Sequence, residues 1–216
     1  MANGRGDLFR AKARLRREVA EVLARLSVQR RREASLALAE RVVRLPFVRG
    51  ARTILAFLSL PTEIETWPII RWAWSQGKRV AVPRVEPPLA DARGAVELRD
   101  IVPVVLERSE VEAPSLHPAV RPGPMGILEV PDVAPVPPAE LDAVLAPCQA
   151  VDRCGRRLGK GGGFYDRFLG RADLAATVAV IAFHEQLVEA VPVAEWDRPV
   201  ETIVTDAETI RVPKGT

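Results

Sequence analysis

Apolar residues recur at helical spacing through the first 26 positions of the chain, which predicts an amphipathic helix over residues 8–26. The apolar positions are Leu8, Leu15, Val19, Val22, Leu23 and Leu26. Serine is a favoured residue at a helix N-terminus, so Ser27 predicts a second helix over residues 28–44.

Five short apolar runs are expected to form buried strands. They are residues 53–59, 79–83, 142–147, 177–183 and 202–206. Between the first two runs, Thr66 is a candidate N-cap, Pro68 fits a first helical turn and Gly77 fits a helix C-terminus. Strand, helix and strand in this order form the unit of a parallel sheet. The sequence therefore predicts an α/β fold: an open, mostly parallel twisted sheet with helices on both faces.

Residues 84–140 contain most of the 19 prolines and differ in character from the segments on either side. Residues 95–100 could form one strand of a peripheral hairpin, and the rest of the stretch is expected to be loop. We therefore interpret residues 1–216 as a single α/β domain. Its basic helical N-terminal segment is residues 1–52, and its proline-rich flap or insertion is residues 84–140.

Polar residues follow the ends of the predicted strands, where ligands of open parallel sheets bind. They are Glu63, Glu65, Arg84, a glycine-rich loop after the strand at 142–147, His184 and Asp206. These segments are expected to converge on one edge of the sheet.

The composition, with 48% hydrophobic and 27% charged residues, is typical of a soluble globular protein. No apolar run approaches the roughly 20 residues that span a bilayer, and the charged N-terminus has no secretory pattern. We therefore expect a cytoplasmic protein with no membrane partner. Cys148 and Cys154 give no disulfide framework and are expected to be reduced thiols.

The positive charge is concentrated at the start of the chain. Residues 1–52 hold 14 Lys and Arg against 5 Asp and Glu, a net charge of +9, whereas the remainder carries −6. A basic arm on an acidic body suggests a polyanionic partner, such as a nucleic acid, a nucleoside triphosphate or a polyglutamylated ligand. The alternative is a solvated, arginine-rich helix face.

The strongest local signal is the loop at residues 157–166, with the sequence Arg-Leu-Gly-Lys-Gly-Gly-Gly-Phe-Tyr-Asp. Its four glycines lie between an apolar strand and a short helix expected from about residue 163. Glycines permit close backbone approach, and successive N–H groups can then form a nest for an anion. The loop matches neither a Walker A nor a dinucleotide-binding pattern. A tight strand-to-helix turn is the alternative interpretation.

The segment DAVLAPCQAVDRCGRRLGKGGGFYDRFL (142–169) resembles the C-terminal signature of 5-formyltetrahydrofolate cyclo-ligases. Other family landmarks follow in the expected order. They are the Lys12-x-x-x-Arg16 element, LSLPTEIET (58–66), GKRVAVPRV (77–85), Gly126-Ile127 and VETIVTD (200–206). Two positions depart from the pattern, because Val130 replaces a usual proline and Val151 a usual phenylalanine.

The resemblance implies that the chain uses ATP and Mg²⁺ to convert 5-formyltetrahydrofolate, with or without a polyglutamate tail, to 5,10-methenyltetrahydrofolate. The implied catalytic residues are Lys12, Arg157, Lys160 and Tyr165. The implied ATP site comprises Lys12, Arg16, Arg157, Leu158, Gly159, Lys160, Gly161, Gly162, Gly163, Phe164 and Tyr165. The implied folate site comprises Leu58, Glu63, Lys160, Gly161, Gly162, Gly163 and Phe164. The implied Mg²⁺ ligands are Asp166 and Asp206.

Two alternatives remain open at this point. One is a non-catalytic nucleotide- or RNA-binding module that reuses the fold, although aromatics at 5% offer little surface for base stacking, and we expect no nucleic-acid partner. The other is a different ATP-dependent ligase or kinase acting on a small acid. His117 and His184 lack a second metal-type ligand at motif spacing and are interpreted as structural or exposed.

Overall fold

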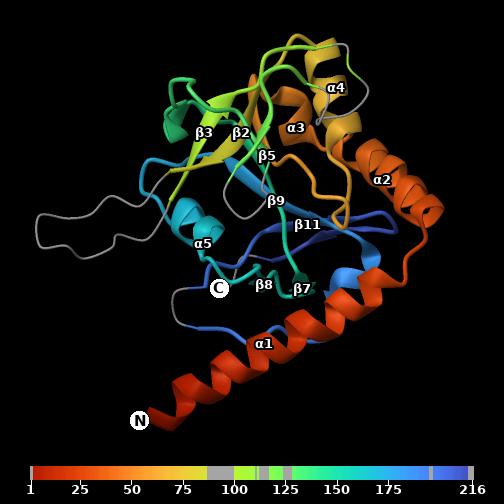
Figure 1. The fold of residues 1–216 in the computed structure, drawn as a ribbon, viewed down its shortest axis with the longest axis vertical. Coiled ribbons are helices and arrows are strands. Elements are labelled where there is room, and N and C mark those ends of the chain that lie inside the picture. Colours follow the sequence, from red (N-terminus) through yellow and green to blue (C-terminus); the bar gives the residue numbers. More distant parts are fainter. Residues whose placement is uncertain are drawn as a thin grey trace, which may run out of the picture.

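The central sheet has seven strands, and its five middle strands are parallel. The computed structural model describes residues 2–86, 100–109, 111, 117–123, 128–194 and 197–213 (Figure 1). Across the sheet the order is β12 (Thr209–Arg211), β11 (Thr202–Thr205), β9 (Thr177–Ala182), β6 (Ala143–Ala146), β1 (Thr53–Ala56), β2 (Arg79–Val85) and β3 (Ile101–Val105). Only the edge strands β12 and β3 run antiparallel to their neighbours. The predicted open, mostly parallel sheet is confirmed.

Side chains alternate along the central strands and divide the core into two halves. In β6, Ala143 and Leu145 face one apolar cluster, whereas Val144 and Ala146 face the other. Successive strand residues point to opposite faces, and both faces of this parallel sheet are covered. This is why the strands read in the sequence as unbroken apolar runs.

Helices cover both faces of the sheet. They are α1 (Ala2–Ala24), α2 (Val28–Val42), α3 (Pro46–Gly50), α4 (Trp67–Ser75) and α5 (Phe164–Leu169). Apolar residues of α1, α2 and α4 belong to the first core cluster, and Phe168 of α5 belongs to the second. Ser27 caps α2 as predicted, because its Oγ accepts a hydrogen bond from the Arg30 N–H at 3.1 Å.

Thr66 occupies the N-cap position of α4, as predicted, but its side chain makes no cap hydrogen bond. Its hydroxyl instead donates to the Phe57 carbonyl at 2.5 Å and fastens the helix start to the segment after β1. Pro68 lies in the first turn and Gly77, at φ 70°, follows the helix, both as predicted.

The proline-rich insertion is not wholly peripheral, contrary to expectation. Residues 101–105 form β3, which pairs with β2 as an edge strand of the main sheet. Further on, β4 (Arg121–Pro122) pairs with β5 (Leu128–Glu129), and a 3-10 turn, η3, spans Pro138–Glu140. The hairpin strand expected at 95–100 lies, apart from Asp100, outside the described residues.

His117 holds part of this insertion against α4. Its ring is buried near the Trp67 and Trp74 rings, at centroid distances of 6.4 and 6.3 Å. Its two ring nitrogens contact the Glu107 carbonyl at 2.8 Å and the Ala119 N–H at 3.1 Å. The structural interpretation of this histidine is confirmed.

A small second sheet, absent from the sequence-based prediction, carries the glycine-rich loop. It consists of β10 (Leu187–Val188), β7 (Ala150–Asp152) and β8 (Arg157–Leu158). The 3-10 turn η4 (His184–Gln186) precedes β10. Figure 1 shows α1 lying below this sheet, and α1 contacts both β7 and η4.

Candidate active site

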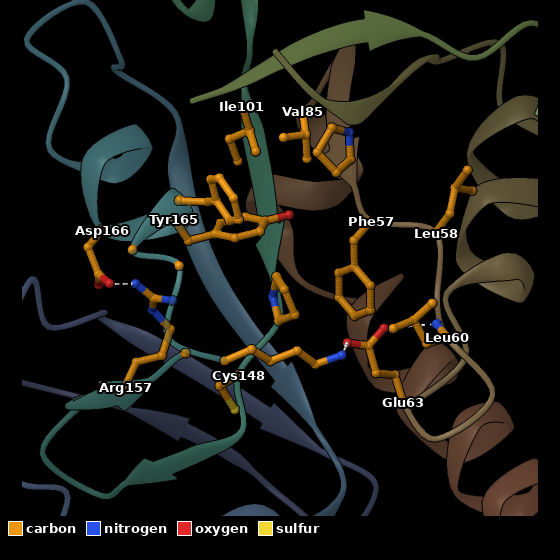
Figure 2. A pocket seen from close by; sticks show the side chains of 17 residues that line it. Phe57, Leu58, Leu60, Glu63, Val85, Ile101, Cys148, Arg157, Tyr165 and Asp166 are labelled. Carbon is orange, nitrogen blue, oxygen red and sulfur yellow. Dashed lines mark hydrogen bonds and ion pairs between the residues drawn. The ribbon is translucent and has the colours of Figure 1, made fainter. Parts of the chain in front are cut away.

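A pocket of about 220 Å³ opens where segments that follow β1 and β6 meet (Figure 2). Its lining is Phe57, Leu58, Leu60, Glu63, Pro83, Val85, Ile101, Pro147, Cys148, Arg157, Gly159, Lys160, Gly162, Gly163, Phe164, Tyr165 and Asp166. After β1 the chain continues to β2 on one side of it and later returns to β6 on the other. Such a reversal of strand order opens a crevice at the carboxyl edge of a parallel sheet.

The predicted convergence of polar residues is only partly confirmed. Glu63 and the glycine-rich loop line the pocket, but Glu65, Arg84, His184 and Asp206 do not. Arg84 pairs with Glu86 at 2.5 Å. The carboxyl ends of β9 and β11 meet the start of α2 instead, where Arg30 pairs with Asp206 at 2.7 Å.

The backbone of the loop favours glycine at two positions, and at a third an added side chain would have to displace the Phe164 ring. Gly161 and Gly163 have φ of 114° and 65°, in the region that L side chains avoid. A Cβ on Gly162 would lie 2.6 Å from the Phe164 ring. The Gly159 carbonyl accepts a hydrogen bond from Arg16 Nε at 2.8 Å. The loop is therefore a tight turn flanked by cations, a conformation that both the nest and the tight-turn interpretations predict.

Two ion pairs tie this loop to its surroundings. Lys160 Nζ lies 2.6 Å from Glu63 Oε1, and Glu63 Oε2 accepts a hydrogen bond from the Leu60 N–H at 2.8 Å. The buried Arg157 guanidinium pairs with Asp166 and lies over the Tyr165 ring, 5.9 Å from its centroid. The Lys160–Glu63 pair joins the two sides of the pocket.

Buried polar groups set the electrostatics of the pocket wall. The Tyr165 hydroxyl points into the pocket in Figure 2 and has no hydrogen-bond partner among the described residues. Burial, reinforced by the Glu63 charge, raises the pKa of this hydroxyl, so it stays protonated at neutral pH. Burial likewise raises the pKa of the Cys148 thiol to about 12. Cys148 and Cys154 are both free thiols, as predicted.

The N-terminal helix supplies two cations to the neighbourhood of the loop without lining the pocket. Arg16 holds the Gly159 carbonyl, whereas Lys12, one turn earlier, pairs with Asp197. Asp197 also accepts a hydrogen bond from the Ala194 N–H at 2.7 Å. Sequence reasoning missed Asp197, because no local motif marks the residue.

The expected metal pair, Asp166 and Asp206, is not brought together in the pocket. Asp166 lines the pocket and pairs with Arg157. Asp206 accepts a hydrogen bond from the His184 N–H at 2.8 Å and pairs with Arg30, outside the lining. Among the described residues, no group of three or more His, Cys, Asp and Glu is arranged to hold a metal ion.

Two other predicted ligand-binding residues are also absent from the lining. Leu158 is buried within the first core cluster, and Gly161 faces Arg16, whose guanidinium carbon would lie 3.7 Å from an added Cβ. Leu58, Gly162, Gly163 and Phe164 line the pocket as expected. In the part of the chain that the structure describes, no helix is long and apolar enough to cross a membrane.

The fold and pocket place the protein among the open α/β proteins that bind small molecules at the carboxyl edge of a parallel sheet. Within that class the chain belongs to the 5-formyltetrahydrofolate cyclo-ligase family, whose sequence profile matches residues 9–206.

Individual relatives agree over most of the chain. It is 34% identical to 5-formyltetrahydrofolate cyclo-ligase of Escherichia coli K12 over 184 residues, 85% of this chain and 93% of that protein. It is 29% identical to the Mus musculus cyclo-ligase over 202 residues, 90% of this chain and 93% of that protein. The NMR structure of Aquifex aeolicus 5,10-methenyltetrahydrofolate synthetase superimposes with a TM-score of 0.75 at 26% identity, covering 95% of this chain and 94% of that chain.

Proposed function

We propose that this protein converts 5-formyltetrahydrofolate and ATP to 5,10-methenyltetrahydrofolate, ADP and phosphate, with Mg²⁺ as cofactor. One observation carries the proposal: a single pocket has the Glu63 segment on one side and the cation-flanked glycine loop on the other. Apolar walls suit a flat folate ring, and the loop suits a phosphate chain.

The reaction needs ATP because the formyl oxygen is a poor leaving group. In the first proposed step this oxygen attacks the γ-phosphorus of ATP and ADP leaves. N10 then attacks the formyl carbon, the C–O bond breaks, and the departing phosphate carries away the formyl oxygen and takes up the N10 proton as the ring closes. Phosphoryl transfer of this kind depends on positioning and charge neutralisation, for which the chain offers Arg157, Lys160 and the loop N–H groups.

The pocket residues divide between the two ligands. Glu63 would accept hydrogen bonds from the pterin N–H groups, and Leu58 and Phe164 would pack on the ring system. Lys160 and the loop glycines would lie between the two ligands and contact both. The protonated Tyr165 hydroxyl is available as a donor to the bound ligand.

Lys12 and Arg16 would act from α1. Arg16 supports the loop through the Gly159 carbonyl. To contact the phosphates, Lys12 would have to break its ion pair with Asp197.

For Mg²⁺ we propose Asp166, which lies in the pocket beside the loop. The ion prefers one or two carboxylates together with water and phosphate oxygens, and it would neutralise phosphate charge. Asp206 enters this proposal only if Arg30 releases it.

The test is to mix folded protein, Mg-ATP and 5-formyltetrahydrofolate and to follow methenyltetrahydrofolate absorbance. We expect product that depends on ATP and Mg²⁺ and is absent with heat-denatured protein. ADP release that does not require the folate would point to another ATP-dependent ligase or kinase. RNA binding without turnover would favour the non-catalytic module, which the structure favours less because Arg30 and Arg31 bind within the protein.

A further inference from the structure

Asp152, at the end of β7, is a fully buried carboxylate that touches none of the pocket space. Its Oδ1 accepts hydrogen bonds from the Cys154 N–H at 3.0 Å and the Arg156 N–H at 3.1 Å. Its Oδ2 accepts from Arg156 Nε at 2.6 Å and the Val191 N–H at 2.8 Å. Four hydrogen-bond donors compensate for the desolvation of the carboxylate. Its two oxygens form a junction between the β7–β8 turn and the segment that begins at Val191.

One side of this junction shapes the β7–β8 turn. The Oδ1 contacts fix residues 153–156, and the residue that follows them is Arg157. Because Arg157 is buried against Asp166 and Tyr165, a small change in the turn would displace its guanidinium within the pocket.

The other side holds the segment that follows β10. Its start is tied through Val191 to Asp152, and its end is tied by the Val200 N–H, which donates to the Gly155 carbonyl at 2.9 Å. Between these two ties lies Asp197, the partner of Lys12. The same turn therefore fixes both Arg157 and, through Asp197, Lys12.

We propose that Asp152 is a positioning residue for the nucleotide half of the pocket. It sets the places of Arg157 and Lys12, whereas the Glu63 segment contacts α2, Lys160 and its own backbone. The identity of the ligand as ATP rests on the proposed function. The positioning role itself requires only an anionic ligand at the glycine loop.

The variant Asp152→Asn keeps the size of the side chain and removes half of its acceptors. Whichever way the amide turns, one pair of donors then faces an NH₂ group. We expect the dissociation constant of a non-hydrolysable ATP analogue to rise about tenfold or more. The reason is that Asp152 loses charge-assisted hydrogen bonds that hold Arg157 and Lys12 in place. The dissociation constant of 5-formyltetrahydrofolate should change by less than about threefold.

Asp142→Asn is the matched control. Asp142 accepts hydrogen bonds from the Arg52 N–H at 2.7 Å and the Thr53 N–H at 2.8 Å, at the amino end of β6 and away from the pocket. Both hydrogen bonds reach the same oxygen of an exposed side chain, and the amide oxygen of Asn can accept both, so this control removes a charge and should leave both affinities unchanged. Calorimetric titration of each ligand alone, on wild type and both variants, gives the comparison.

A parallel loss of both affinities in Asp152→Asn, or no loss in either, would overturn the positioning role. If this variant does not fold, Arg156→Gln removes one of the four donors and should shift nucleotide affinity in the same direction by a smaller factor. Wild-type protein that binds nucleotide but not the folate contradicts the proposed function, and the nucleotide measurements still decide the role of Asp152. Wild-type protein that binds neither ligand overturns both.

Discussion

The Tyr165 hydroxyl is buried at the pocket wall without a hydrogen-bond partner among the described residues. Such a group costs free energy in the folded protein, and a bound ligand that accepts its hydrogen bond recovers that free energy. The hydroxyl therefore has the character of a binding group that stability alone does not explain.

Tyr165→Phe should accordingly separate activity from stability. We expect turnover to fall about two- to tenfold, the value of one neutral hydrogen bond. The free energy of unfolding should stay the same or rise, because the variant removes a buried unpaired group. Steady-state kinetics and urea unfolding check the two effects, and a stability loss of the same size as the activity loss would contradict this interpretation.

The buried Cys148 thiol should make the fold weaker in alkali. Its pKa is about 12 in the folded protein against an ordinary value of 9.0, because burial disfavours the thiolate. Above the ordinary value the unfolded chain releases this proton while the folded chain retains it. Stability contributed by the thiol is thus complete below that pH and falls as pH rises toward the folded value.

The corresponding prediction compares Cys148→Ala with the exposed Cys154→Ala. Between about pH 8 and about pH 10.5, wild type should lose about 2 kcal/mol more unfolding free energy than Cys148→Ala. Cys154→Ala should follow wild type. Urea unfolding at the two pH values gives these differences, and equal losses in all three proteins would refute the cause.

At the scale of single residues, the sequence identified the pocket residues that belong to local motifs. Glu63, Lys160 and Asp166 were found because each belongs to a motif that the pocket retains. Asp197 was missed because its partner, Lys12, is 185 positions away and the contact depends on how a loop packs against α1. Asp206 was misplaced because the end of its strand meets Arg30 instead of the pocket.

At the scale of elements, the turn between β7 and β8 requires glycine at position 155 for two reasons, its backbone conformation and the lack of space for a side chain. Gly155 has φ 79°, and an added Cβ would lie 2.2 Å from the Val200 carbonyl oxygen. Gly77 after α4 has a similar φ of 70° but open space around it. Substitution at the two positions therefore separates the cost of backbone strain, which both share, from the cost of steric contact, which only Gly155 has.

Gly155→Ala should cost clearly more stability than Gly77→Ala. Strain alone is worth about 1 to 2 kcal/mol, which is the loss expected for Gly77→Ala. Gly155→Ala should exceed that value, because the residue 200 backbone must also move. It should also weaken nucleotide binding through the displaced Asp197 segment. Denaturant unfolding of both variants gives the two losses of unfolding free energy. Equal losses would show that the residue 200 backbone moves away from an added Cβ at no cost.

The elements that the sequence predicted well are the helices α1, α2, α4 and α5 and the five parallel strands, whose patterns are local; α3 was not predicted. Strand β3 was missed because proline at position 103 argues against a strand. The register places Pro103 opposite Pro83. Neither residue has an N–H to donate, so this pair requires no hydrogen bond between the strands. An edge position beside another proline is information that only the folded sheet contains.

At the scale of the whole molecule, the pocket is built from segments that the sheet order brings together. Residues after β1 and β6 meet because those strands are neighbours, although about 90 positions separate them in the chain. The sequence predicted the edge of the sheet correctly but could not give the order of its strands. It therefore could not tell which of the polar strand ends would share one pocket.

The ion pair between Lys160 and Glu63 implies thermodynamic linkage between the two substrates. The proposed function assigns Glu63 to the folate and Lys160 in part to ATP, yet without ligands each neutralises the other. A folate that engages Glu63 releases Lys160 for the phosphates, and by reciprocity ATP favours the folate.

Glu63→Gln should therefore change the two affinities in opposite directions. The folate should bind more weakly, whereas a non-hydrolysable ATP analogue alone should bind about two- to fivefold more tightly, the value of a partly exposed ion pair. Glu65→Gln, from the same loop, should alter neither affinity. Calorimetry decides, and weaker nucleotide binding by Glu63→Gln would contradict the linkage. If the linkage holds, ATP that arrives alone finds Lys160 already occupied, and the protein is protected against hydrolysing ATP when no folate is present.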